Sequence, residues 1–136
     1  MKTDKKNFAV MLIDDNAIDN MIHAKVIANS DIAEVTYNHH SGPSAIEFLK
    51  NIAKIPACEG QNLLPSYVFL DLDMPLMDGF QFMAEFEKLN EKIIKDIKIV
   101  LLTASINASD KEYPKRFKNF YRYINKPLSI LEIADL

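Results

Sequence analysis

Short apolar runs alternate along the chain with longer stretches in which apolar residues recur every three or four positions. The first run, Phe8 to Ile13, is typical of a buried strand, and the stretch after it is typical of a helix that Asn16 could cap. The alternation continues to the end of the chain. It predicts five strands, at residues 8–13, 33–37, 67–70, 97–102 and 121–124. Three predicted helices carry the apolar stripes Ile18, Met21, Ile22 and Val26; Ala45, Phe48, Leu49 and Ile52; and Phe82, Met83, Phe86 and Leu89.

The segments outside these patterns are less regular. Residues 54–65 contain two prolines and a glycine and are expected to form a loop. We expect residues 107–119 to be partly helical, although Pro114 within them should break or kink the helix. Residues 128–136 should form a short last helix, and the polar residues 1–6 should form a flexible N-terminal tail.

The order of these elements predicts the fold class. Strands that alternate with helices, without repeats or low-complexity segments, indicate a parallel sheet covered by helices on both faces. Right-handed crossovers then produce a doubly wound α/β fold, and 136 residues suit a single domain over residues 1–136. In such sheets, functional groups gather beyond the carboxyl ends of the strands, near the topological switch point.

Composition narrows the classes of function. The chain is 49% hydrophobic and 26% charged, and its net charge of −3 provides no broad attraction to nucleic acid or to an anionic membrane. The polar start is neither a signal peptide nor a membrane span. A single cysteine excludes an intrachain disulfide and a thiolate metal cluster. We therefore expect a cytoplasmic protein with no direct nucleic-acid or membrane partner.

Polar residues stand where the predicted strands end. Asp14 and Asp15 follow the first strand, Asp71 the third and Thr103 the fourth, while Lys126 comes shortly after the fifth. Because the carboxyl ends of parallel strands lie at one edge of a sheet, these side chains should converge there. That convergence is the main evidence for a functional site.

Three carboxylates at one edge need a counter-charge. Two carboxylates about 4 Å apart repel by roughly 4 kcal/mol at an effective dielectric constant near 20. Lys126 alone cannot neutralise three of them. Mg²⁺ fits a site with few carboxylates, since it keeps several waters and accepts phosphate oxygens. Ca²⁺ is disfavoured, because neither residues 14–20 nor residues 71–79 follow the spacing of a calcium loop.

Four motifs, each at the end of a predicted strand, carry a family resemblance over essentially the whole chain. They are Leu12-Ile13-Asp14-Asp15-Asn16, Phe69-Leu70-Asp71-Leu72-Asp73-Met74-Pro75-Leu76-Met77-Asp78-Gly79, Val100-Leu101-Leu102-Thr103-Ala104-Ser105 and Tyr123-Ile124-Asn125-Lys126-Pro127. In this order they resemble the receiver domain of two-component response regulators. The resemblance implies a flavodoxin-like (βα)5 sandwich with a five-stranded parallel sheet of order 2-1-3-4-5.

The resemblance also implies roles for the residues at the sheet edge. Asp71 would accept a phosphoryl group from a sensor histidine kinase or a histidine phosphotransfer protein. Asp15, Asp71 and the backbone carbonyl of Asp73 would ligate Mg²⁺, and Asp14 would act largely through water. Lys126 and Thr103 would contact phosphoryl oxygens. A receiver catalyses its own phosphorylation and dephosphorylation and is not a turnover enzyme on external substrates.

The resemblance also implies that phosphorylation changes a protein-binding surface. In the family, Thr103 moves toward the phosphoryl group and the aromatic ring at Tyr123 turns inward. These movements reshape the face formed by the fourth helix, fifth strand and fifth helix, which would bind a downstream protein or a second copy of the chain. The bond between Lys126 and Pro127 is commonly cis in relatives. The family commonly has Asn where Asp73 stands, and Pro114 predicts an atypical output face.

Two other functions remain open at this point. One is an interaction scaffold whose acidic site is inactive. The other is a Mg²⁺-dependent aspartyl-phosphate phosphatase, because Asp71-Leu72-Asp73 resembles the start of the haloacid-dehalogenase motif, although that family places it on the first strand and has Thr or Val where Pro75 stands. The three histidines lack metal-ligand spacing and are predicted to lie on the surface: His23, His39 and His40.

Overall fold

The computed structural model describes residues 7–55, 63–104 and 112–136. Five strands form one sheet in which every neighbouring pair is parallel. They are β1 (Asn7–Ile13), β2 (Ala33–His39), β3 (Tyr67–Asp71), β4 (Lys98–Thr103) and β5 (Phe120–Asn125). The strand order is β2-β1-β3-β4-β5, which confirms the predicted doubly wound, flavodoxin-like topology.

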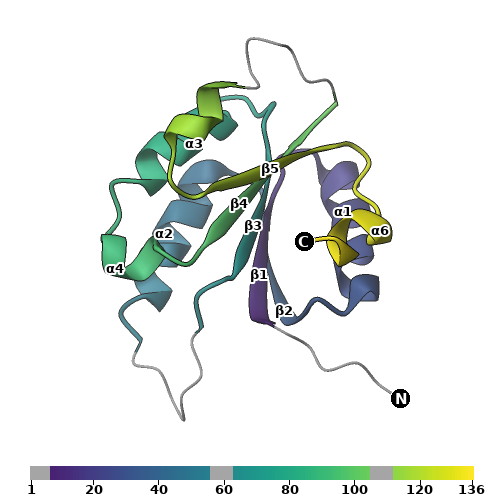
Figure 1. The fold of residues 1–136 in the computed structure, drawn as a ribbon, viewed down its shortest axis with the longest axis horizontal. Helices are drawn as coiled ribbons and strands as arrows, with labels where there is room; N and C mark the ends of the chain where they lie inside the picture. Colours follow the sequence, from purple (N-terminus) through teal and green to yellow (C-terminus); the bar gives the residue numbers. More distant parts are fainter. Residues whose placement is uncertain (1–6, 56–62, 105–111) are drawn as a thin grey trace.

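Helices cover both faces of this sheet (Figure 1). On one face lie α1 (Ala17–Ser30) and α6 (Ile130–Ala134), and on the other lie α2 (Gly42–Ile52), α3 (Gly79–Phe86) and α4 (Glu91–Ile94). The four-residue helix α4, which Asn90 caps, was not predicted from the sequence. Helix α6 is shorter than the predicted segment 128–136.

The apolar runs of β1, β3 and β4 are buried on both sides, as the centre of a parallel sheet requires. Alternate residues of β1 enter different clusters: Met11 and Ile13 pack toward α2 and α3, while Val10 and Leu12 pack toward α1 and α6. All four side chains are fully buried. The two clusters hold β1 and β3 side by side in the centre of the sheet, and both strands end at the same edge.

The segment between β4 and β5 departs from an ordinary helix. Its described part contains a 3-10 helix, η1 (Tyr113–Arg116), in which Pro114 lies at the start. This agrees with the expectation that Pro114 interrupts helical structure, since proline lacks the N–H that a helix interior requires. The rest of the predicted helical stretch, at residues 105–111, lies outside the described residues, as do the predicted tail 1–6 and most of the predicted loop 54–65.

Helix α1 turns most of the predicted apolar stripe toward solvent. Ile18 and Met21 are each 65% exposed, whereas Asn20, His23 and Ile27 face the sheet and are buried. The prediction that His23 lies on the surface is therefore wrong. The physical reason is the amide of Asn20, which donates hydrogen bonds to the carbonyls of Asp14 (3.0 Å) and His39 (3.2 Å) and fixes the rotation of the helix.

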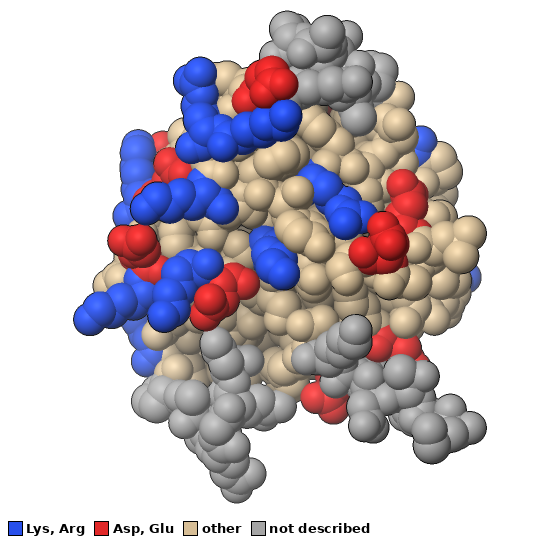
Figure 2. All heavy atoms as spheres, in the orientation of Figure 1, with Lys and Arg blue, Asp and Glu red and all other residues tan. Residues whose placement is uncertain are grey.

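The surface has mixed charge on the face that Figure 2 shows, where Lys and Arg side chains lie among Asp and Glu side chains. Within the described ranges, no helix is both long enough and apolar enough to cross a membrane.

Candidate functional site

Three acidic side chains meet where β1 and β3 end. Asp14 and Asp15 directly follow β1, and Asp71 is the last residue of β3. One carboxylate oxygen of each residue lies within 4.8 Å of those of the other two. Asp14 and Asp71 are buried, while Asp15 is exposed. Such a set of hard oxygen donors, open to solvent on one side, suits a cation that keeps part of its water shell.

Lys126 faces these carboxylates from the segment after β5. Its Nζ lies 2.9 Å from Asp71 Oδ1, 3.7 Å from Asp14 Oδ2 and 3.6 Å from Asp19 Oδ2. The backbone N–H of Lys126 donates to the carbonyl of Thr103 at 2.8 Å, which ties this segment to the end of β4. The peptide bond between Lys126 and Pro127 is cis.

Thr103 and Asp73 also lie at this edge of the sheet, beside Asp71. The hydroxyl of Thr103, the last residue of β4, donates to Asp73 Oδ2 at 3.5 Å, and the backbone N–H of Asp73 donates to Asp71 Oδ1 at 3.1 Å. Tyr123 lies on β5, half-buried, with its ring 5.4 Å from that of Phe120. The structure thus brings Asp14, Asp15, Asp71, Asp73, Thr103 and Lys126 to one edge of the sheet and places Tyr123 on the neighbouring strand.

Local hydrogen bonds hold the first acidic pair in place. Asp14 Oδ1 accepts from the backbone N–H of Asn16 at 3.0 Å. The side chain of Asn16 in turn caps α1 by accepting from the N–H groups of Ile18 and Asp19. The turn from β1 into α1 is therefore fixed by its own sequence.

The pKa values of the two buried carboxylates, Asp71 and Asp14, shift in opposite directions. Burial raises the pKa of Asp71; the hydrogen bond and charge of Lys126 oppose this, the charge of Asp14 adds to it, and the pKa stays above its ordinary value. Burial also acts to raise the pKa of Asp14, but the adjacent His23, the Asn16 amide and Lys126 outweigh it and lower that pKa. Burial alone would lower the pKa of Lys126, yet the three carboxylates around it raise it, so that its ammonium remains charged.

Comparison with known proteins identifies the family. The sequence model of the response regulator receiver domain matches residues 10–136. The chain belongs to this family. It is a receiver domain of the kind that two-component signalling uses.

Individual relatives agree with this assignment. The receiver domain is similar to the sensor histidine kinase CheAY of Helicobacter pylori, with 27% identity over 94% of this chain. It spans 14% of the length of that relative and 8% of that of the hybrid signal transduction histidine kinase D of Dictyostelium discoideum. Among solved structures, a two component response regulator from Cytophaga hutchinsonii has a TM-score of 0.83 at 23% identity, covering 96% of this chain and 94% of the other.

One solved structure of a relative contains a partner. It is a co-crystal of the Saccharomyces cerevisiae histidine phosphotransfer signaling protein Ypd1 with the receiver domain of its downstream response regulator Ssk1. The matched chain of that complex is 19% identical to this chain, with a TM-score of 0.72. The match covers 97% of this chain and 87% of the other. At this level of identity it supports the fold alone, and the complex with a phosphotransfer protein is a property of that receiver domain.

Three residues beside the acidic site of this receiver domain were not predicted from the sequence to lie there: Asp19, Asn20 and His23. All come from α1. Asn16, Asn20, His23 and Ile27 follow one another at intervals of four, three and four, which is the spacing of one helix face. This mostly polar stripe directly after the acidic pair was the available signal for a helix face turned toward the site.

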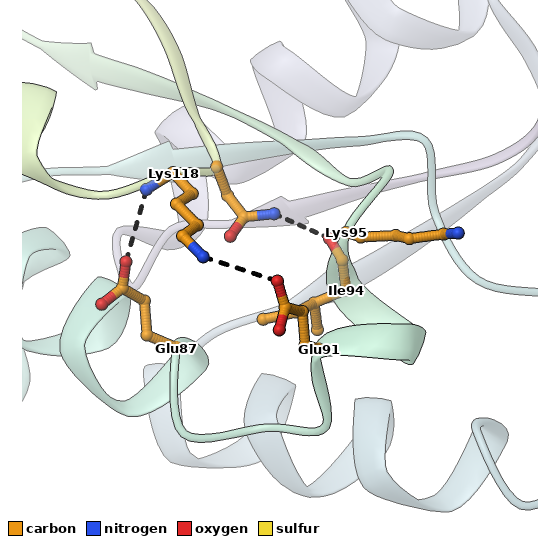
Figure 3. Close-up of a pocket in the computed structure, with 6 residues that line it drawn as sticks. Glu87, Glu91, Ile94, Lys95 and Lys118 are labelled. Carbon is orange, nitrogen blue, oxygen red and sulfur yellow. Dashed lines mark hydrogen bonds and ion pairs between the residues drawn. The ribbon is translucent and has the colours of Figure 1, made fainter.

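A surface pocket of about 350 Å³ lies away from this site (Figure 3). Lys95 in its lining lies shortly before β4, and Lys118 and Asn119 lie directly before β5. This part of the lining is therefore at the amino ends of these strands, opposite the acidic edge. Lys118 contacts both acidic residues of the lining. Its Nζ lies 3.4 Å from Glu91 Oε1, and its backbone N–H donates to Glu87 Oε2 at 3.3 Å. The Asn119 amide donates to the carbonyl of Ile94 at 2.7 Å. None of the residues of the acidic edge lines this pocket, so it is not the candidate site.

Because burial raises the pKa of Asp71, we expect the ionised carboxylate that the proposed chemistry needs to destabilise the folded protein at neutral pH. Since the folded chain binds the proton of Asp71 more tightly than the unfolded chain, the free energy of unfolding falls as the pH rises through the folded pKa. Asp71→Asn should therefore stabilise the metal-free protein at pH 7 by about 1 kcal/mol. The expected increase in Tm is about 3–5 °C.

Thermal unfolding followed by circular dichroism in EDTA measures this effect. The gain should shrink as the pH is lowered, because Asp71 in the unmodified protein then becomes neutral as well. Asp96→Asn makes the same charge change at an exposed position before β4 and should change Tm by much less. A lower Tm for Asp71→Asn than for the unmodified protein at pH 7 would contradict the argument.

Proposed function

We propose that this receiver domain accepts a phosphoryl group on Asp71 in a Mg²⁺-dependent reaction and thereby switches a protein-binding surface. The observation that supports this most strongly is the cluster of side chains at the carboxyl ends of β1, β3, β4 and β5. There a buried Asp71 lies 2.9 Å from Lys126 and within 4.8 Å of the other two acids. Phosphoryl transfer depends chiefly on positioning and on neutralising charge, and this cluster can provide both.

The transfer is a displacement at phosphorus. Lys126 and the N–H of Asp73 both contact Asp71 Oδ1, so we propose that Oδ2 attacks the phosphorus of a phosphohistidine. The new P–O bond forms as the P–N bond breaks, and the bonding electrons leave with the imidazole of the donor. Lys126 then pairs with a phosphoryl oxygen. Mg²⁺ held by Asp15, Asp71 and the carbonyl of Asp73, with Asp14 acting through water, would neutralise charge on the transferred group.

Thr103 and Tyr123 are the proposed switch. In the unphosphorylated structure the Thr103 hydroxyl donates to Asp73, and we propose that it moves to a phosphoryl oxygen while Tyr123 turns inward. Inverting a 1:99 population takes about 5.5 kcal/mol, whereas one hydroxyl hydrogen bond supplies about 1 kcal/mol. Lys126 and repacking around Tyr123 must supply the rest. Dimerisation through the face beside β5 remains a prediction of the same switch.

The proposed phosphodonor is a histidine kinase or a histidine phosphotransfer protein. Helix α1 begins two residues after Asp15, and its exposed apolar side chains, Ile18 and Met21, give a partner a docking surface beside the pocket. Met21→Lys should slow transfer from a phosphohistidine protein about 10-fold, since losing 1.4 kcal/mol of binding has that effect. An unchanged rate would exclude this surface of α1.

The proposal is tested with a small phosphodonor. After incubation with acetyl phosphate and Mg²⁺, the intact mass should increase by one phosphoryl group, and hydroxylamine should remove it, as expected of an acyl phosphate. EDTA should prevent the adduct, and Asp71→Asn should not form one. An adduct of equal yield in EDTA or on Asp71→Asn would contradict the proposal. Absence of an adduct would favour the scaffold, and sustained turnover of a phosphate ester would favour the phosphatase.

A further inference from the structure

His23 lies next to Asp14 of the acidic cluster, on the buried side of α1. Its Nδ1 is 3.7 Å from Asp14 Oδ2, and the two side chains are 3% and 0% exposed. Within the described part of the chain, neither of these buried atoms has a hydrogen-bond partner. Leaving a buried polar atom without a hydrogen-bond partner is energetically unfavourable. These two atoms face each other at 3.7 Å, so a small movement would let each satisfy the other.

The other partners of Asp14 explain why such a contact is useful. Asp14 Oδ1 is held by the N–H of Asn16 at 3.0 Å, whereas Oδ2 lies 3.7 Å from both His23 Nδ1 and Lys126 Nζ. Lys126 is shared with Asp19 and Asp71. When Lys126 turns toward a phosphoryl oxygen, Asp14 loses its share of that charge, and His23 is the group left beside Oδ2.

We propose that His23 positions the Asp14 carboxylate by donating a hydrogen bond from Nδ1 to Oδ2, which orients Asp14 toward the cation of this pocket. The inference rests on the proposed function. A shortening of less than 1 Å relative to the 3.7 Å separation would form this bond. Partners that orient metal-binding carboxylates in this way typically contribute 10- to 100-fold to metal affinity. His23 is a positioning residue, since it would act through Asp14 and would not touch the metal.

Three substitutions separate this role from simple filling of the core. His23→Phe retains an aromatic ring but removes the donor. His23→Asn places an amide N–H close to where Nδ1 lies and should rescue the function. His23→Leu provides a second apolar variant if the phenylalanine variant does not fold. Mg²⁺ affinity is measured by isothermal titration calorimetry on the full chain, after circular dichroism has shown that each variant is folded.

The dissociation constant for Mg²⁺ should rise about 10-fold in His23→Phe and in His23→Leu, and less than about threefold in His23→Asn. A value within twofold of the unmodified protein in both apolar variants would overturn the inference, as would an equal loss in His23→Asn. If the unmodified protein itself binds no Mg²⁺, the proposed function fails. Normal Mg²⁺ binding in both apolar variants contradicts only the role of His23.

A spectroscopic measurement tests the donor directly. Long-range ¹H–¹⁵N correlation of the labelled imidazole should show a proton on Nδ1 of His23 in the Mg²⁺-bound protein, because only that nitrogen faces Asp14 Oδ2. An unprotonated Nδ1 would overturn the proposal, since the hydrogen bond would then have no donor.

Discussion

Asp15→Asn should lower Mg²⁺ affinity about 100-fold or more and slow phosphorylation of Asp71 by a comparable factor. Asp15 is the exposed member of the acidic cluster and is the proposed direct ligand beside Asp71. Removing a ligand should cost at least the 10- to 100-fold that is typical of losing an outer partner. Calorimetry measures the affinity, and the initial rate of adduct formation with acetyl phosphate measures the reaction.

The matched control is Asp96→Asn. It makes the same charge change at an exposed position near the amino end of β4, on the edge of the sheet away from the acidic cluster. Affinity and rate should stay within about twofold of the unmodified protein, since distant exposed charges are largely screened. If Asp15→Asn bound Mg²⁺ normally, Asp15 would not be a ligand and the proposed arrangement of the pocket would be wrong.

Lys126→Met should separate metal binding from phosphoryl transfer. Methionine keeps an unbranched stem but removes the ammonium 2.9 Å from Asp71 and 3.7 Å from Asp14. Loss of one preorganised donor to the transferred group typically slows a reaction about 100- to 1,000-fold, and we expect a decrease in this range. Mg²⁺ affinity should instead increase severalfold, because a competing positive charge has been removed from the carboxylates.

The two quantities are measured as for Asp15→Asn, with Lys95→Met as the control for loss of an exposed lysine near the opposite edge of the sheet. Lys126→Met leaves buried carboxylates without their ion pair, so its metal-free form should be less stable. Both measurements are therefore made in Mg²⁺ on protein whose folding has been checked. A decrease in Mg²⁺ affinity, or phosphorylation within tenfold of the normal rate, would contradict the role assigned to Lys126.

The central sheet could be predicted because its signals are local and strong. The central strands β1, β3 and β4 are short apolar runs that are mostly buried. Asp14 directly follows β1, and Asp71 is the last residue of β3. Parallel strands necessarily bring such terminal residues to one edge. The sequence therefore predicted which residues meet there, although it contained no information on distances such as the 2.9 Å between Lys126 and Asp71.

The orientation of α1 could not be predicted from apolar periodicity. Ile18 and Met21 marked the helix, but they are exposed, and the buried face contains Asn20 and His23. That orientation depends on hydrogen bonds from Asn20 to carbonyls at the ends of β1 and β2, which are tertiary contacts. Tertiary contacts of this kind override the usual relation between hydrophobic periodicity and burial. The role now proposed for His23 was hidden for the same reason.

A crystal structure of the protein with Mn²⁺ in place of Mg²⁺ and with beryllium trifluoride as a phosphoryl mimic tests the central claim most directly. Anomalous scattering would locate the metal. We predict a metal bound by Asp15, Asp71 and the Asp73 carbonyl, with the mimic on Asp71 and within hydrogen-bond distance of Lys126 Nζ and Thr103 Oγ1. A metal bound elsewhere, or a mimic that does not engage Asp71, would contradict the account.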